Sequence, residues 1–108
     1  MARFEIDASE IQDMSSFHDV FSRTLRFFDG YGRNMDAWID CMTDLHGPTA
    51  LSSLHLPDGE GIDLVLHGAQ ELGRRTPEIL RELIECTAFV NRRYRSQDSE
   101  VRVALVFT

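Results

Sequence analysis

The chain has 108 residues, of which 43% are hydrophobic, and a formal net charge of −7 at pH 7. This length suits one domain with a hydrophobic core, and the hydrophobic share argues against disorder. Eighteen acidic residues stand against eleven basic ones, all arginine. Because an acidic surface repels phosphate backbones and attracts basic proteins, we expect a basic protein partner and no direct nucleic-acid binding.

The cysteines and the first residues bear on the compartment. Cys41 and Cys86 are too few for a disulfide framework, and each lies in an apolar helical pattern where free cysteine is usually buried. The chain enters a strand pattern at once, so we expect no signal peptide. No apolar run approaches the roughly 20 residues that span a bilayer. The prediction is a cytoplasmic protein with no membrane contact, monomeric when free.

The first half of the chain shows a strand and then a helix. Apolar and charged residues alternate at 2–7, which predicts a strand. Helical spacing of apolar residues predicts a helix at about 16–28 that buries Phe28, with Ser15 or Ser16 as its N-cap. Asp and Gly residues then break this helix.

A second helix carries a row of carboxylates. Asn34 is a strong N-cap residue, and the apolar stripe that follows consists of Met35, Trp38, Ile39, Met42 and Leu45. On the opposite side lie Asp36, Asp40 and Asp44, with Thr43 beside them. Like charges four residues apart cost an isolated helix a few tenths of a kcal/mol per pair. The row therefore needs either water or a cationic partner.

The sequence pattern in the middle of the chain predicts a hairpin. Residues 51–56 and 62–67 predict strand, turn, strand around the turn signal Asp58-Gly59, with 62–67 as the better buried strand. The following residues, 68–75, are ambiguous between a loop and a short helix.

A long helix and a strand complete the prediction. Thr76 and Pro77 mark the start of a helix that runs toward Tyr94 and ends in arginines. The apolar run at 101–107 reads as a last strand buried on both faces. Helices between strands imply an α/β domain with a small parallel sheet.

Motifs of enzymes and of bound cofactors are absent from the sequence. It has no phosphate-binding glycine loop, no GxSxG, no HExxH and no CxxC. Three alternatives stay open: His55 and His67 as a metal or acid–base pair across the hairpin, the aspartate row as a Mg²⁺ or Ca²⁺ site, and Arg74-Arg75 with Arg92–Arg95 as a phosphate patch. Surface histidines, a solvated helix face and helix-end charge complementarity are the plainer interpretations. We therefore expect no enzyme, no cofactor and no metal.

The stretch from Tyr31 to Thr43 carries a resemblance. It reads Tyr-Gly-Arg-Asn-Met-Asp-Ala-Trp-Ile-Asp-Cys-Met-Thr. The barstar family of intracellular ribonuclease inhibitors has the motif Tyr-Gly-Glu-Asn-Leu-Asp-Ala-Leu-Trp-Asp-Cys-Leu-Thr, without a gap. Outside these 13 residues, the order of strands and helices is also similar to that family over most of the chain.

The resemblance implies a fold and a function. The fold is one barstar-like domain over 1–108, a three-stranded parallel sheet packed with helices, to which 51–56 could add a strand. The function is stoichiometric inhibition of a basic ribonuclease, whose active site the acidic helix plugs by imitating RNA phosphates. The partner-binding residues that the resemblance implies are Asp36 and Asp40, then Gly32, Asn34, Thr43, Asp44 and Glu85.

The sequence departs from the family at three places, and two of them, Gly30 and residues 46–61, favour an alternative. The family's aromatic residue before Tyr-Gly is Gly30 here, Asp44 replaces a glycine, and residues 46–61 read as an insertion after the acidic helix. The alternative is an interaction module with the same fold that binds a different basic protein.

Overall fold

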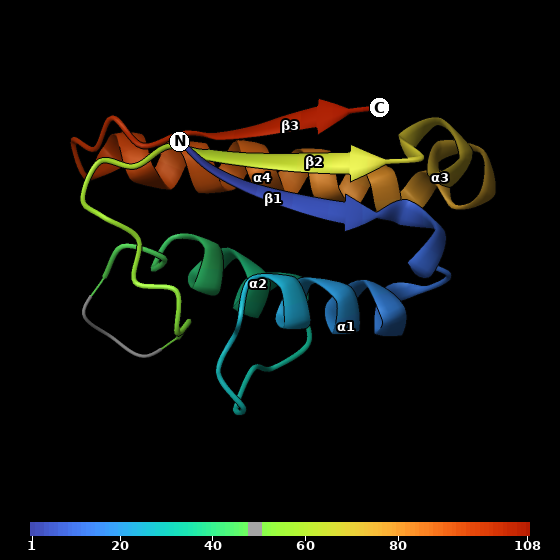
Figure 1. Ribbon diagram of the computed structural model, residues 1–108, viewed down its shortest axis with the longest axis horizontal. Coiled ribbons are helices and arrows are strands. Elements are labelled where there is room, and N and C mark those ends of the chain that lie inside the picture. Colours follow the sequence, from blue (N-terminus) through green and yellow to red (C-terminus); the bar gives the residue numbers. More distant parts are fainter. Residues whose placement is uncertain (48–50) are drawn as a thin grey trace.

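A computed structural model describes residues 1–47 and 51–108. Its elements in chain order are β1 (Ala2–Asp7), η1 (Ala8–Glu10), α1 (Met14–Thr24), α2 (Met35–Met42), β2 (Ile62–His67), α3 (Ala69–Arg75), α4 (Pro77–Ser96) and β3 (Val103–Phe107). The strands form one parallel sheet in the order β1-β2-β3 (Figure 1). This arrangement confirms the predicted α/β class and the small three-stranded parallel sheet.

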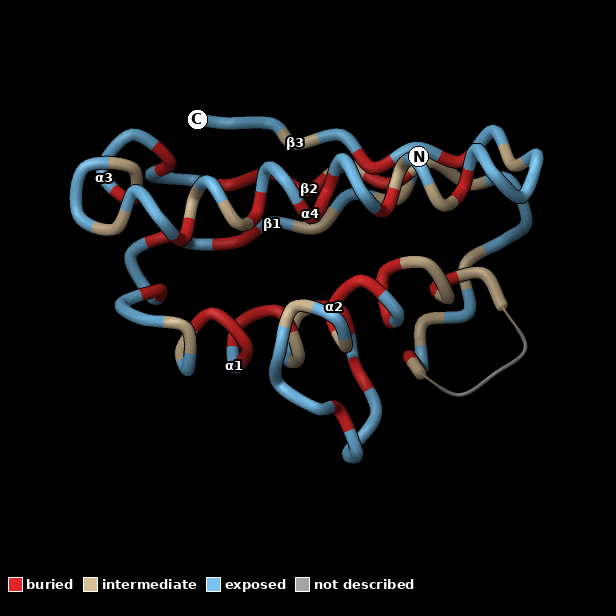
Figure 2. The backbone as a smooth tube through the Cα atoms, turned by 180° about the vertical axis from the view of Figure 1, so that it is seen from behind, coloured by how far each residue is buried: buried red, intermediate tan, exposed pale blue. Residues whose placement is uncertain are grey.

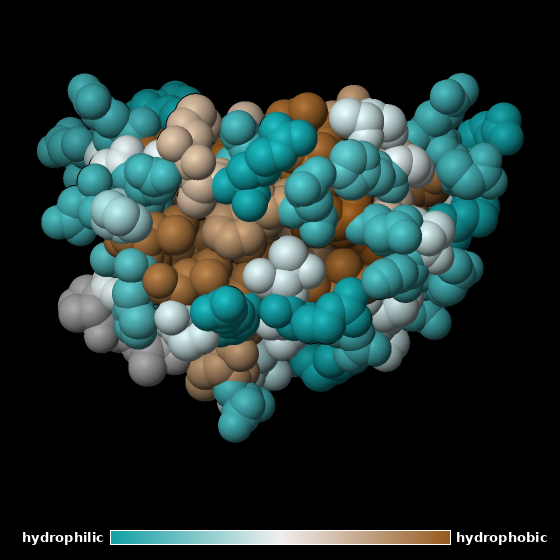
Figure 3. All heavy atoms as spheres, in the orientation of Figure 1, coloured by the Kyte–Doolittle hydropathy of each residue, from teal (hydrophilic) through white to brown (hydrophobic). Residues whose placement is uncertain are grey.

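The two faces of the sheet differ. In the register, Phe4 pairs with Leu64, and Leu64 pairs with Leu105, on the face that packs against the helices. The opposite face carries Arg3 and Glu5, both exposed, and it looks toward the viewer in Figure 1, with α4 behind the sheet. Figure 3 shows hydrophilic side chains standing over this face with apolar surface between them. Parallel sheets are usually covered on both faces, so the alternating pattern of β1 is what allows one face to meet water.

The prediction of a doubly buried last strand is wrong. Val103 is buried, but Ala104 and Val106 are exposed and Phe107 is 45% exposed. β3 is an edge strand, and its second face belongs to the open side of the sheet. A run of apolar residues does not reveal whether a second layer covers them.

The first helix is shorter than predicted. α1 begins after Asp13, whose carboxylate accepts the backbone N–H of Ser16 in a capping box, and it ends at Thr24. Arg26 has a left-handed φ of 55°, which turns the chain out of the helix. Phe28 therefore lies in a loop and is 39% exposed, so its predicted place in the core is wrong.

Residues 51–56 do not form the predicted hairpin strand. Ser52 instead makes an isolated antiparallel bridge with Phe27, and its hydroxyl donates to the carbonyl of Leu25 at 2.7 Å. These contacts fasten the segment after α2 to the loop before it. Residues 48–50 of the predicted insertion lie outside the described residues, and the insertion itself stays a prediction.

The core joins the sheet to helices α1, α2, α3 and α4. Trp38 of α2 and Phe17 and Phe21 of α1 are fully buried, with Phe21 edge-on to the indole ring. Figure 2, seen from behind, shows α4 running along the strands over the back of the sheet, with α1 and α2 below it. The short helix α3, which the sequence left ambiguous, leads into α4. Among the described residues, no helix is long and apolar enough to cross a bilayer.

Candidate functional site: an acidic surface on α2 and α4

Helix α2 presents two carboxylates to solvent. Asn34 caps the helix as predicted, with its side-chain oxygen accepting the N–H of Ala37 at 2.8 Å. The stripe that includes Trp38 and Met42 is buried, while Asp36 and Asp40 are exposed. Asp36 lies in the first turn, where the helix dipole stabilises an anion. The same helical periodicity that buries one side therefore turns these two carboxylates outward.

Asp40 has a cationic partner within the chain. Arg93 of α4 donates from Nη1 to Asp40 Oδ1 at 2.8 Å and to Thr43 Oγ1 at 3.3 Å. The Thr43 hydroxyl in turn donates to the carbonyl of Ile39 at 2.9 Å, so its lone pairs remain for Arg93. The sequence was interpreted as giving Arg93 a helix-end role or a place in a phosphate patch, and it did not predict this contact. Its position three residues after buried Val90 places it at the border of the buried stripe, which is the signal that could have identified this contact.

Helix α4 adds two more carboxylates beside Asp36. Burial, together with the charges of Glu82, Glu85 and Asp36, raises the pKa of the Cys86 thiol to about 11. Charges on both helices therefore act on one thiol where α2 packs against α4. Glu85 lies on α4, which packs against α2, and both Glu85 and Asp36 are exposed. We call this set, Asp36, Asp40, Glu82 and Glu85, the acidic surface.

Asp44 lies outside the helical row. α2 ends at Met42, and Asp44 follows in a turn, where it is half-buried. Burial, together with the charges of Asp40 and Asp44, raises the pKa of the Cys41 thiol to about 11. Asp44 also lines a cavity of about 450 Å³ together with Asp58 and Tyr94. Because residues of both segments line this cavity, the turn at 57–60 lies next to the end of α2.

Tyr94 of α4 fixes the end of α2. Its hydroxyl, which is buried, donates to the carbonyl of Met42 at 2.7 Å. Burial and the charge of Asp44 raise the pKa of this phenol, so it remains a donor at neutral pH. The helix end that carries Thr43 is thereby tied to α4.

The loop before α2 is anchored by two polar contacts. His18 Nδ1 lies 2.5 Å from the Tyr31 hydroxyl, and both side chains are buried. Arg33 pairs with Asp19 at 2.8 Å and donates to the carbonyl of Ser15. These contacts hold the loop, which contains the predicted interface residue Gly32, against α1.

Gly30 has an aromatic side chain above it. A Cβ at Gly30 would lie 2.6 Å from Cε2 of Phe28, so the ring of Phe28 occupies the space that a side chain at residue 30 would need. Sequence reasoning missed this exposed aromatic ring because the apolar spacing assigned Phe28 to the core.

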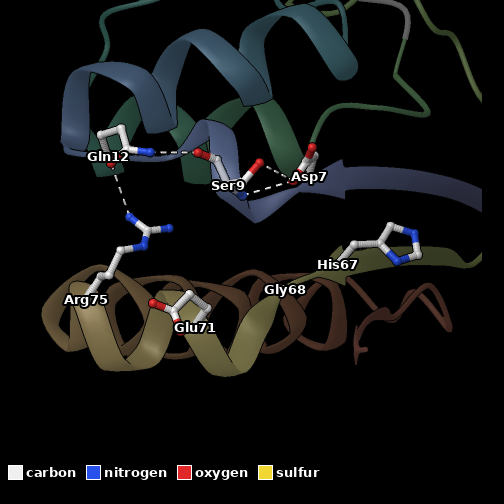
Figure 4. Close-up of a pocket in the computed structure, with 7 residues that line it drawn as sticks. All are labelled: Asp7, Ser9, Gln12, His67, Gly68, Glu71 and Arg75. Atoms are coloured by element: carbon white, nitrogen blue, oxygen red, sulfur yellow. Dashed lines mark hydrogen bonds between the residues drawn. The ribbon is translucent and has the colours of Figure 1, made fainter.

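A second polar pocket lies at the carboxyl ends of β1 and β2 (Figure 4). Ser9 donates to Asp7 at 2.7 Å, and Arg75 donates to the carbonyls of Ala8 and Ile11. These polar groups hold η1 against α3. The Nε2 atom of His67 lies 2.9 Å from Oε1 of Glu5, and its Nδ1 atom lies 2.7 Å from the hydroxyl oxygen of Thr108.

The alternative of a facing histidine pair is wrong. His55 lines a cavity with Arg26 and Phe28, whereas His67 lies at the end of β2. Within 1–47 and 51–108, no three His, Cys, Asp or Glu side chains come together in a way that could hold a metal ion.

The fold and this surface define a class of protein: a small α/β domain whose acidic helix packs on a buried aromatic core and turns its carboxylates outward. The barstar family model, described as Barstar (barnase inhibitor), matches residues 1–106. The chain therefore belongs to the barstar family, whose members are inhibitors rather than enzymes. A comparison with curated protein sequences found no significant match.

Proposed function

We propose that the protein is a stoichiometric inhibitor of a small basic ribonuclease. Asp36 and Asp40 stand in place of two RNA phosphates in the nuclease active site, with Glu85 as a third anion. The observation that carries this proposal is the pair of outward carboxylates on α2, in a chain of the barstar family. An inhibitor of this kind needs anions that face a cationic cleft and a surface charge that speeds association.

Several neighbouring residues complete the proposed interface. Gly32 and Asn34 lie exposed in the turn that leads into α2, and Thr43 and Asp44 lie at its other end. The buried, free cysteines suit a reducing compartment, so we propose that the inhibitor acts in the cytoplasm.

The test is capture of the partner followed by titration. The immobilised protein is used to recover binding proteins from the source organism, and any recovered ribonuclease is titrated with Asp36→Ala, Asp40→Ala and wild-type protein. We expect one-to-one inhibition by wild type and an increase in Kd of about tenfold or more for each variant, which corresponds to about 1.4 kcal/mol. Barnase serves as a second nuclease in the same titration.

Glu71→Ala is the matched control. Glu71 is an exposed acid on α3, so the variant changes net charge equally away from the acidic surface. We expect it to inhibit as wild type does. If Asp40→Ala and Glu71→Ala inhibit equally well, the phosphate-mimic role is wrong. Recovery of a basic protein that cleaves no RNA would support the alternative interaction module.

A further inference from the structure

Arg93 already occupies the position in which the proposed function requires a partner's cation. Its Nη1 lies 2.8 Å from Asp40 Oδ1 and 3.3 Å from Thr43 Oγ1, and both acceptors belong to the proposed interface. We propose that Arg93 is a built-in competitor at Asp40, which a partner's cationic group must displace in order to bind. The relevance of this displacement to inhibition rests on the proposed function.

The geometry shows what the Asp40–Thr43 pair accepts. A carboxylate oxygen and a hydroxyl oxygen together receive one guanidinium nitrogen, so the pair is a receptor for an N–H donor carrying positive charge. Arg93 reaches this position from α4, with its guanidinium carbon 5.6 Å from the ring centroid of Phe89. Phe89 is itself 45% exposed, so the arginine lies on the molecular surface.

The contact is weak enough to be replaced. The side chains of Arg93 and Asp40 are 35% and 60% exposed, and one nitrogen makes the ion pair. Exposed ion pairs contribute little because water screens them and both side chains lose freedom. Displacing Arg93 therefore costs a partner about two- to fivefold in affinity.

The competitor makes the acidic surface selective. A partner with a diffuse basic patch must break the contacts of Arg93 with Asp40 and Thr43 and makes no equivalent contact in return. A partner with a well-placed N–H donor replaces those contacts with its own. Arg93 also comes from the segment 74–108, which holds 7 arginines against 5 acids. The basic end of the chain thus neutralises part of the acidic helix.

Arg92 provides a matched control. Its guanidinium carbon lies 5.5 Å from the same Phe89 ring, yet among the described residues it makes no hydrogen bond to Asp40. Arg92→Gln and Arg93→Gln change net charge equally and sit on neighbouring positions of α4. A difference between them therefore reports the contact with Asp40 rather than total charge.

The experiment measures cation binding with and without a nuclease. A tetra-arginine peptide is titrated at low salt into R92Q, R93Q and the double variants D40N/R92Q and D40N/R93Q, with binding followed by NMR. We expect R93Q to bind the peptide about two- to fivefold more tightly than R92Q, with the largest shifts at Asp40 and Thr43. We expect this advantage to disappear in the D40N background.

The same variants are then titrated against the captured ribonuclease, where we expect the same advantage for R93Q. Equal peptide affinities, an advantage that survives D40N, or equal affinities for a bound nuclease would each overturn the competitor role. If wild-type protein and all variants fail to bind any ribonuclease, the proposed function fails, while the peptide titration still decides whether Arg93 competes at Asp40.

Discussion

At the scale of single residues, His18 links protonation to the loop before α2. Its ring is buried against Phe17 and lies within hydrogen-bond distance of Tyr31. Burial lowers the pKa of His18 below its ordinary value of 6.5, and the nearby charge of Arg33 lowers it further, partly opposed by Asp19. The fold therefore favours the neutral imidazole.

This lowered pKa predicts loss of stability in mild acid. Below pH 6.5 the unfolded chain binds a proton at His18 more readily than the folded chain does. The contribution of His18 to the unfolding free energy is therefore fully present above pH 6.5. It is lost as the pH falls from 6.5 through the pKa of the folded state. Urea unfolding at pH 7.5 and 5.5 should show a larger loss for wild type than for His18→Gln. Equal losses would contradict the assignment.

The carboxyl groups do not account for this effect. The pKa of Asp13, for example, is lowered from 3.8 by the Ser16 N–H, so its contribution is lost well below pH 5.5. The comparison with His18→Gln removes any remaining background from acids, because both proteins carry the same ones.

At the scale of elements, the position of the acidic surface depends on the contact between α2 and α4. The Tyr94 hydroxyl satisfies the buried carbonyl of Met42, one of the groups that a helix end leaves without a partner. Val90, one turn before Tyr94, is fully buried on the same side of α4. The acidic surface is therefore built from two helices that hold each other in place.

We predict that Tyr94→Phe loosens the end of α2. The variant keeps the ring but leaves a buried carbonyl unpaired, which costs about 1–3 kcal/mol of unfolding free energy. Urea unfolding measures this loss, and hydrogen exchange should speed up at the end of α2. The control is Phe89→Ala on the same helix, where a 45% exposed ring should cost less. An unchanged Tyr94→Phe protein would rule out the anchoring role.

At the scale of the whole molecule, the charges are unevenly distributed along the chain. Residues 1–73 hold 13 acids and 4 arginines, a balance of −9, while residues 74–108 have a balance of +2. The fold brings both parts together at α2 and α4, where Arg93 meets Asp40. The net charge of −7 still leaves the molecule able to attract a basic partner at a distance.

This charge predicts salt-sensitive association. As the Debye length falls from about 30 Å at 10 mM to about 3 Å at 1 M salt, the association rate with the captured ribonuclease should fall by about tenfold or more, and the dissociation rate should change less. Stopped-flow binding measures both rates. The double variant D36N/D40N should show a shallower salt dependence, and an association rate insensitive to salt would refute steering.

Some sequence patterns predicted the structure correctly, and others did not. The alternation in β1 predicted this strand correctly, because alternation follows directly from strand geometry. The apolar run of β3 led to a wrong prediction of burial on both faces. An edge strand can expose Val106 even though its sequence is apolar throughout. Phe28 misled for a related reason: helical spacing continued past Thr24, but Arg26 turned the chain away.

The sequence by itself determined the features that local geometry controls. Helical periodicity and the Asn34 cap were enough to place Asp36 and Asp40 outward and Trp38 inward, and the motif around them identified the family. The tertiary structure decided which cation meets Asp40, because Arg93 lies 53 residues away and reaches it only when α4 packs against α2. It also decided that Asp44 leaves the helical row and that Phe28 covers Gly30. The Arg93 contact depends on how segments distant in sequence pack together, which no local pattern encodes.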